Sequence, residues 1–409
     1  MLIDLFPRAH GRFTALPLLG PHLDRFVRWL GVLGLGKISI SRRISRTPRL
    51  DHMLRGEGIH ELGQLSRADL LAFAPRRSSD DTYLSAVVRS LAAYLGERGT
   101  LAASVATPTE QLVGAYRDYL DQVRGFAAST VSGHDASASE LLGFLRFDDD
   151  PTVLRALSAA LLEEFVKSVA ARMSRASMQH VTAHLRSFLR FLASRDEVAS
   201  GLDATIDRPR VYRQEQVPRA LPWETVQMLL AAIDRTTAMG RRDYAMLLIM
   251  ATYGLRASEV TALHLDHLSW RAMQFQVPRP KTKTPIVLPL TLEVGAALLD
   301  YLRHGRPTSA HRQVFLRVRK PCGPLGPSSV GMAFDGWRGR SALDIPAAGA
   351  HCLRHSLALH LLRQGTSLKA IGDLLGHRSM ESTCVYLRLH VEDLRAAALD
   401  LPVETEAHR

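Results

Sequence analysis

The chain has 409 residues, 46% of them hydrophobic, so it can bury enough apolar surface for two or three domains and is not expected to be disordered. Its 52 Lys and Arg outnumber its 40 Asp and Glu, and the formal net charge of +12 favours a polyanionic partner such as nucleic acid. The longest early apolar run, 29–36, is too short to span a membrane, and the charges just before it are unlike a signal peptide. The sequence therefore predicts a cytoplasmic protein.

Residues 1–106 form the first predicted region. Its hydrophobic periodicity indicates helical patches at 23–32 and 83–95. The stretch between them contains a basic run at 37–49, KISISRRISRTPR. Nothing in this region indicates its role.

Residues 107–200 form a strongly helical second region. Three arginines, Arg175, Arg186 and Arg190, lie off or at the end of its clearest apolar stripe. They indicate either a solvated basic face or a helix that faces DNA, and the net charge favours DNA. The stripe advances in alternating steps of three and four residues through Met178, Val181, Leu185, Phe188 and Leu192.

A basic linker is predicted at 201–220. Proline at 209 and 218 disfavours regular structure there, so a domain boundary is expected. The arginines of this linker are further candidates for DNA binding: Arg208, Arg210 and Arg213.

The region that follows begins with helices predicted at 223–234 and 241–252, and a third helix starts near Ala257. The period then changes to two at Met273, Phe275 and Val277, and a second apolar run covers 286–290. These two runs predict a β-hairpin. Its turn contains Lys281 and Lys283, and helices resume after it.

Several side chains suited to phosphate chemistry occur in this last region. Arg256 lies at a predicted helix start, where its charge would add to the backbone donors of the helix to bind an anion. His351 and Arg354 are three residues apart, so one helical face can present both to a single phosphate. His377 follows a glycine, and Tyr386 comes nine residues later. His355 and His360, on the same predicted helix as Arg354, are interpreted as packing or solvent residues.

The order of these residues resembles the catalytic domain of the tyrosine recombinases, the family of phage integrases and Xer-type resolvases. The segments HCLRHSLALHLLRQG and LLGHRSMESTCVYLRL are similar to the two sequence boxes of that family. The resemblance covers roughly 215–395. Residues 108–199 look like the family's helical core-binding domain by helical content and position, whereas 1–106 match nothing.

The resemblance implies a mainly α fold with a small antiparallel β-sheet, in which the core-binding domain and an α+β catalytic domain form a C-shaped clamp around DNA. The predicted divisions are 1–106, 107–200, 201–220, 221–395 and a tail at 396–409.

The resemblance also implies an enzyme that cleaves and rejoins DNA strands through a 3′-phosphotyrosine, with Tyr386 as nucleophile. Arg256 and Arg354 would stabilise the charge on the phosphate oxygens. His351 and His377 would add hydrogen-bond donors or move the proton of the tyrosine. Lys281 would be the general acid for the leaving 5′ oxygen, with Lys283 as its rival, and Glu259 would orient Arg256.

No metal or other cofactor is expected. Asp344 and Asp373 are separated by a stretch without any carboxylate, and no metal-binding spacing or nucleotide-binding loop occurs in the catalytic region. The three cysteines lack a C-x-x-C spacing and are expected to be reduced thiols.

The expected partners are double-stranded DNA recombination sites and further copies of the chain, in a tetramer on two sites, with accessory or directionality proteins as further candidates. A short apolar stripe at Val391, Leu394 and Ala398 predicts a terminal helix that packs either on its own domain or on a neighbouring subunit. A bacterial, nucleoid-associated location is implied.

Two other classes of protein stay open at this point. A helix-turn-helix regulator would explain the segment 366–389 but would not need Arg256, His351 or Tyr386. A type IB topoisomerase-like enzyme would use the same chemistry without exchanging strands between two DNA sites.

Overall fold

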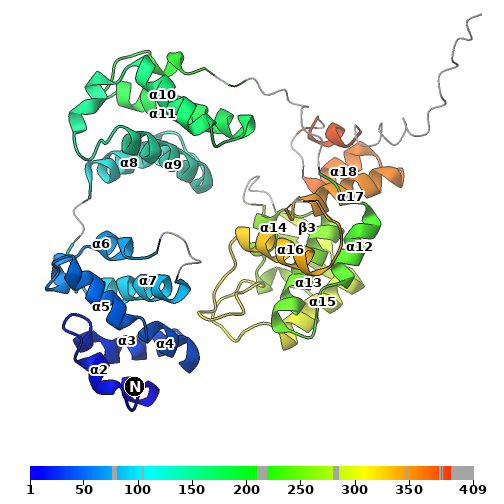
Figure 1. The fold of residues 1–409 in the computed structure, drawn as a ribbon. Helices are drawn as coiled ribbons and strands as arrows, with labels where there is room; N and C mark the ends of the chain where they lie inside the picture. The colour runs from blue at the N-terminus through cyan, green and yellow to red at the C-terminus, as the bar shows by residue number, and fades with distance from the viewer. Residues whose placement is uncertain are drawn as a thin grey trace, which may run out of the picture. The chain divides into compact units, whose positions relative to one another are not determined.

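The computed structural model has many helices and one small antiparallel sheet, which confirms the predicted fold class (Figure 1). It describes residues 1–75, 81–103, 106–207, 209, 219–279, 285–346, 349–376, 379 and 381–387. The chain divides into two units, one made of Met1–Arg46 with Gln216–Arg409 and the other of Thr47–Glu215. No helix within the described ranges is long and apolar enough to cross a membrane.

The first hundred residues are helical, and the predicted patches at 23–32 and 83–95 are confirmed by α3 and α7. The basic run 37–49 falls on α4 and the beginning of α5. The elements are α1 (Leu2–Leu5), α2 (His10–Thr14), α3 (Gly20–Val32) and α4 (Lys37–Ile44) in the first unit, and α5 (Thr47–Gly56), a 3-10 turn (Leu62–Gln64), α6 (Arg67–Ala72) and α7 (Thr82–Glu97) in the second.

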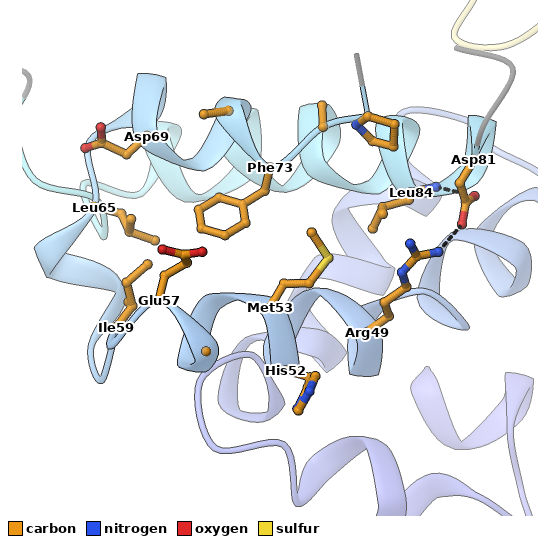
Figure 2. A pocket seen from close by; sticks show the side chains of 14 residues that line it. Arg49, His52, Met53, Glu57, Ile59, Leu65, Asp69, Phe73, Asp81 and Leu84 are labelled. Atoms are coloured by element: carbon orange, nitrogen blue, oxygen red, sulfur yellow. Dashed lines mark hydrogen bonds and ion pairs between the residues drawn. The ribbon is translucent and has the colours of Figure 1, made fainter. Parts of the chain in front are cut away.

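A hollow of about 990 Å³ lies between α5 and the pair α6 and α7 (Figure 2). Met53 and Phe73 line it, and Arg49 pairs with Asp81 at 3.4 Å on its border. Its described lining contains no serine, cysteine or tyrosine. The hollow lies outside the region 215–395, which contains the candidate catalytic residues.

The region predicted to be strongly helical consists of α8 (Pro108–Asp118), a π-helical turn (Tyr119–Val123), α9 (Ala128–Phe144), α10 (Ala159–Ala170) and α11 (Arg175–Ala193), with 3-10 turns at Pro151–Ala156 and Leu202–Thr205. α11 packs on α9 and α10. The predicted apolar stripe of α11 is buried, which confirms it: Met178, Val181, Leu185, Phe188 and Leu192 all belong to one core cluster with residues of α8, α9 and α10.

The remaining elements are α12 (Trp223–Ala231), α13 (Ala238–Tyr253), α14 (Ala257–Thr261), a 3-10 turn (Leu265–His267), β1 (Leu268–Ser269), β2 (Gln274–Val277), β3 (Ile286–Pro289), α15 (Leu292–His304), α16 (Ser328–Arg340), α17 (Cys352–Arg363) and α18 (Leu368–Leu375). A further helical stretch covers 381–387. The three predicted helices and the hairpin are confirmed. The first of these helices ends at Ala231 rather than at 234, because the chain turns at Asp234, which caps the backbone amide of Thr236.

The sheet has the order β1-β2-β3 and is antiparallel throughout, with Phe275 opposite Leu288. Phe275 and Val277 are buried, as the period of two predicts. Met273 is outside the strand and 39% exposed, so its inclusion in the alternating set is wrong. Its φ of 48° places it in the left-handed region, which a continuing strand does not allow.

α13 is the central helix of this region, because α15, α16 and α17 all pack on it. Nearly every turn of α13 is buried, and an internal ion pair joins Arg242 to Asp243, whose carboxylate also accepts a hydrogen bond from Trp337 at 2.9 Å. α13 ends at Gly254, in the left-handed conformation that favours glycine. This end of α13 and the adjacent helix α17 position the residues that are described next.

Candidate active site

Arg354 is the best-buried charge of the site, with only 2% of its surface exposed. It lies in the first turn of α17 and donates from Nη1 to the Gly254 carbonyl at 2.6 Å and from Nη2 to the Leu375 carbonyl at 2.7 Å. Burial lowers its pKa to about 10, and the nearby charge of Arg256 adds to this effect. Because that pKa is well above neutral, Arg354 stays a cation, and its direct hydrogen-bond partners are neutral carbonyls.

Arg256 lies between the end of α13 and the start of α14, as predicted for a helix start. Its Nη1 donates to Oε1 of Glu259 at 2.7 Å, and its backbone amide donates to Oε2 of the same carboxylate at 2.8 Å. Glu259 is 3% exposed and holds the guanidinium in place, so the predicted contact of these two residues is present. Glu259 occupies the backbone amide of Arg256, and the predicted binding of an anion by the Arg256 side chain and the helix start stays a prediction.

His351 immediately precedes α17 and keeps an exposed face. The protein atoms around its ring lower the pKa by burial, and the charges of Arg354 and Arg256 lower it further. His351 is therefore neutral at pH 7. The predicted proximity of His351 and Arg354 agrees with this electrostatic coupling between them.

Tyr386 lies in the helical stretch 381–387 and is 1% exposed. Its ring packs with Ala358, Ile371 and Leu375, and its hydroxyl lies 3.0 Å from Nδ1 of His355. Burial raises the pKa of Tyr386, and the charges of Arg354 and Arg256 oppose that rise. At neutral pH the hydroxyl is protonated, so attack on a phosphate needs a group that accepts this proton and access of the phosphate to a buried oxygen.

His355 is the site residue that the sequence analysis missed. Its interpretation as a packing or solvent residue is incomplete, because it contacts the oxygen of Tyr386 and its ring packs edge-on against His351 at 4.7 Å between centroids. The signal available in the sequence is its spacing of four from His351, which places both rings on neighbouring turns of one helical face. His360 agrees with its interpretation as a packing residue, because it stacks on Trp223.

We expect His355→Phe to slow DNA cleavage by about 100-fold, because the ring volume is kept while the acceptor for the tyrosine proton is lost. His355→Asn is the matched control, since its amide oxygen can keep the hydrogen bond to Tyr386 but cannot take up the proton, so it should be about as slow as the Phe variant. Single-turnover cleavage rates at saturating protein measure the effect. Equal rates for wild type and the Phe variant would contradict this use of His355.

Six of the candidate residues lie outside the described part of the chain: Lys281, Lys283, His377, Arg208, Arg210 and Arg213. The terminal stripe at 391–398 also lies outside it. Arg175, Arg186 and Arg190 are on α11, where Arg175 and Arg190 are exposed and Arg186 is partly buried. Arg190 is 3.9 Å from the carboxylate of Asp203.

No group of three metal-ligating side chains occurs among the residues that the structure describes. The three cysteines are free thiols, as predicted, and burial raises the pKa of Cys352, next to His351, to about 12. Cys352 is therefore a protonated packing residue and not a second nucleophile.

Comparison with known proteins places this site in a family. The phage integrase family model matches residues 219–393, which include all the residues of the site. A putative integrase/recombinase of Sinorhizobium fredii, y4rA, is 34% identical over 390 residues, covering 93% of this chain and 94% of that protein. The tyrosine recombinase XerD of Lacticaseibacillus casei is 27% identical, over 70% of this chain and 96% of that protein.

The fold also matches a solved structure, a lambda integrase tetramer bound to a Holliday junction. The TM-score is 0.53 at 14% identity, and the match covers 80% of this chain and 90% of that one. The family match and the recombinase relatives define an enzyme that cleaves and rejoins DNA strands. The chain belongs to the tyrosine recombinase family, also called the phage integrase family.

Proposed function

We propose that this chain is a site-specific DNA recombinase that cleaves and rejoins strands through a covalent 3′-phosphotyrosine at Tyr386. One observation carries the proposal. Arg354 donates to the carbonyl of Leu375, whose side chain packs with the ring of Tyr386, and the charges of Arg354 and Arg256 lower the pKa of the Tyr386 hydroxyl against its rise by burial. A phosphate that reaches this hydroxyl therefore meets two fixed cations.

The reaction needs each of these groups for a different step. The oxygen of Tyr386 attacks phosphorus as its proton leaves, and the bond from phosphorus to the 5′ oxygen breaks. Arg256 and Arg354 stabilise the charge that develops on the non-bridging oxygens. His355 is placed to accept the proton of the tyrosine, while neutral His351 can donate one hydrogen bond to the phosphate. A 5′ hydroxyl of the partner strand then attacks the phosphotyrosine and releases Tyr386.

The leaving 5′ oxygen needs a proton, and we assign this role to Lys281, with Lys283 as the rival. Both lie in the sequence between β2 and β3, two strands that pair in the catalytic region. We assign His377, after the left-handed Gly376, as a further donor to the phosphate. The family resemblance supports these assignments.

DNA binding is assigned to a second region. The cluster of buried residues at 112–206 is separate from the cluster at 221–353, which supports a core-binding domain at 107–200, a linker at 201–220 and a catalytic domain at 221–395. In this proposal, the DNA phosphates contact the linker arginines and the arginines of α11, and the two domains clamp the duplex. This proposal gives no role to residues 1–106 or to the tail at 396–409.

We further propose that the active form is a tetramer on two DNA sites. The lambda integrase structure named above is a tetramer on a Holliday junction, and the apolar stripe 391–398 suits an exchange of terminal helices between subunits. The proposal includes accessory proteins that determine the direction of recombination. It also includes a location at the bacterial nucleoid.

Fragments of the DNA that flanks the encoding gene provide the test. We expect the protein to bind one fragment, to attach to it covalently in the presence of EDTA and to yield joint molecules from two copies of it. Supercoil relaxation without joint molecules would indicate a topoisomerase-like activity instead. Binding without covalent attachment would contradict the proposal of an enzyme. It would favour the alternative that the protein is a helix-turn-helix regulator.

A further inference from the structure

Arg279 is a third arginine at this site, and no role has been assigned to it above. It follows β2 by two residues, and its Nη2 donates to the carbonyl of Leu374 at 3.0 Å. Arg354 donates to the next carbonyl, that of Leu375, at 2.7 Å. Two guanidinium groups from distant parts of the sequence therefore bind adjacent carbonyls at the C-terminal end of α18.

The end of α18 suits two cations. The last carbonyls of a helix have no partners within the helix and carry the negative end of its dipole. Gly376 then ends α18 in the left-handed conformation, with φ of 65°. A side chain at this position would overlap Nη1 of Arg279, so the glycine also makes room for that guanidinium. The position of Arg279 at the end of α18 therefore depends on both the Leu374 carbonyl and the absence of a side chain at Gly376.

Arg279 also belongs electrostatically to the catalytic cluster. Burial lowers its pKa, while the carboxylate of Glu259 raises it and the charge of Arg256 lowers it. In turn, the charge of Arg279 is one of those that lower the pKa of Arg354. Its Nε is buried, and no described group accepts a hydrogen bond from it.

We propose that Arg279 is a positioning residue for Arg354: by holding the Leu374 carbonyl, it fixes the end of α18 whose next carbonyl orients the Arg354 guanidinium toward the phosphate. The inference rests on the proposed function, because it needs Arg354 to act on a scissile phosphate. A displacement of about 1 Å at a catalytic group costs about 100-fold in rate. We therefore expect Arg279→Ala to cleave about 100-fold more slowly at unchanged affinity for a single half-site.

Two chemical changes in the substrate identify the group through which Arg279 acts. A methylphosphonate at the cleavage position removes one charged oxygen, so it relieves the need for an arginine there. A sulfur in place of the leaving 5′ oxygen relieves the need for a general acid, because a thiolate leaves unprotonated. Arg354→Ala and Lys281→Ala are the reference variants for the first and the second substrate.

We expect the defect of Arg279→Ala to shrink at least tenfold on the methylphosphonate, as for Arg354→Ala, and to persist on the sulfur substrate. Arg279→Lys keeps the charge but cannot reproduce the planar fork, so it should be intermediate. Rescue on the sulfur substrate alone would overturn the inference, because Arg279 would then act through the general acid. Equal defects on all three substrates would also overturn it, by indicating a purely structural role.

Gly376→Ala provides an independent variant. Its methyl group should displace Arg279, so the defect of Gly376→Ala should match that of Arg279→Ala, and combining the two changes should add nothing. Gly365→Ala is the matched control: it has the same left-handed backbone, with φ of 81°, but nothing lies within 4 Å of the added carbon. Additive defects in the double variant would overturn the inference.

Failure of the proposed function would look different. In that case the wild type would form no covalent adduct on any of the three substrates. Failure of the inference alone leaves the wild type and both reference variants behaving as described, with only the Arg279 and Gly376 variants departing from expectation.

Discussion

Replacing Tyr386 with phenylalanine is expected to abolish covalent attachment to DNA and to leave binding nearly intact. The ring packs against Ala358, Ile371 and Leu375, and phenylalanine keeps those contacts. The change removes the oxygen that attacks phosphorus and its hydrogen bond to His355. Loss of one buried hydrogen bond lowers the free energy of unfolding by about 1 kcal/mol, so the variant should stay folded.

A duplex nicked close to the cleavage position measures this effect, because the short released strand diffuses away and traps the adduct. The wild type should accumulate adduct with EDTA present, since no step of the proposed mechanism uses a divalent ion. Thermal unfolding and half-site gel shifts serve as controls for folding and binding. Adduct formation by the phenylalanine variant would contradict the assignment of Tyr386.

The second large effect is expected for Arg354→Ala. A hydrogen-bond donor that stabilises developing negative charge contributes about 100-fold to 1000-fold in rate, and Arg354 is the most buried of the cationic donors described at this site. The change also leaves the carbonyls of Gly254 and Leu375 without their guanidinium, which costs about 1–3 kcal/mol of stability for each unsatisfied acceptor. Cleavage and stability should therefore both fall.

Two further variants separate these contributions. Arg354→Lys keeps a cation but cannot donate to both carbonyls in the geometry of the planar fork, so it should recover part of the stability and little of the rate. Arg303→Ala removes an exposed arginine from the last turn of α15 and should change neither. Single-turnover cleavage and chemical unfolding measure the two effects. A lysine variant with wild-type cleavage would mean that charge alone, and not the bidentate geometry, is what Arg354 supplies.

Much of the fold was predictable from local patterns. The stripe on α11 and the hairpin β2–β3 follow directly from periods of 3.6 and 2. β1 was not predicted, because two residues are too few to show any period. The contact of Arg256 with Glu259 was predictable because a spacing of three on a helix brings the two side chains together.

The contacts that complete the site were less accessible from the sequence. Arg279 reaches Leu374, 95 residues away, and no local pattern encodes such a contact. His355 and Tyr386 are 31 residues apart in the sequence, and their contact results from the packing of α17 against the last described helical stretch. Histidine and arginine are also common on surfaces, so neither residue stands out by type.

The most direct test of the account is to map the covalent adduct. After cleavage of the nicked duplex, nuclease and trypsin digestion should leave nucleotides on the peptide 379–388, whose only tyrosine is Tyr386. We expect attachment of this tyrosine to a 3′ phosphate, with a free 5′ hydroxyl on the released strand. Attachment at a 5′ phosphate, or to any other residue, would contradict it.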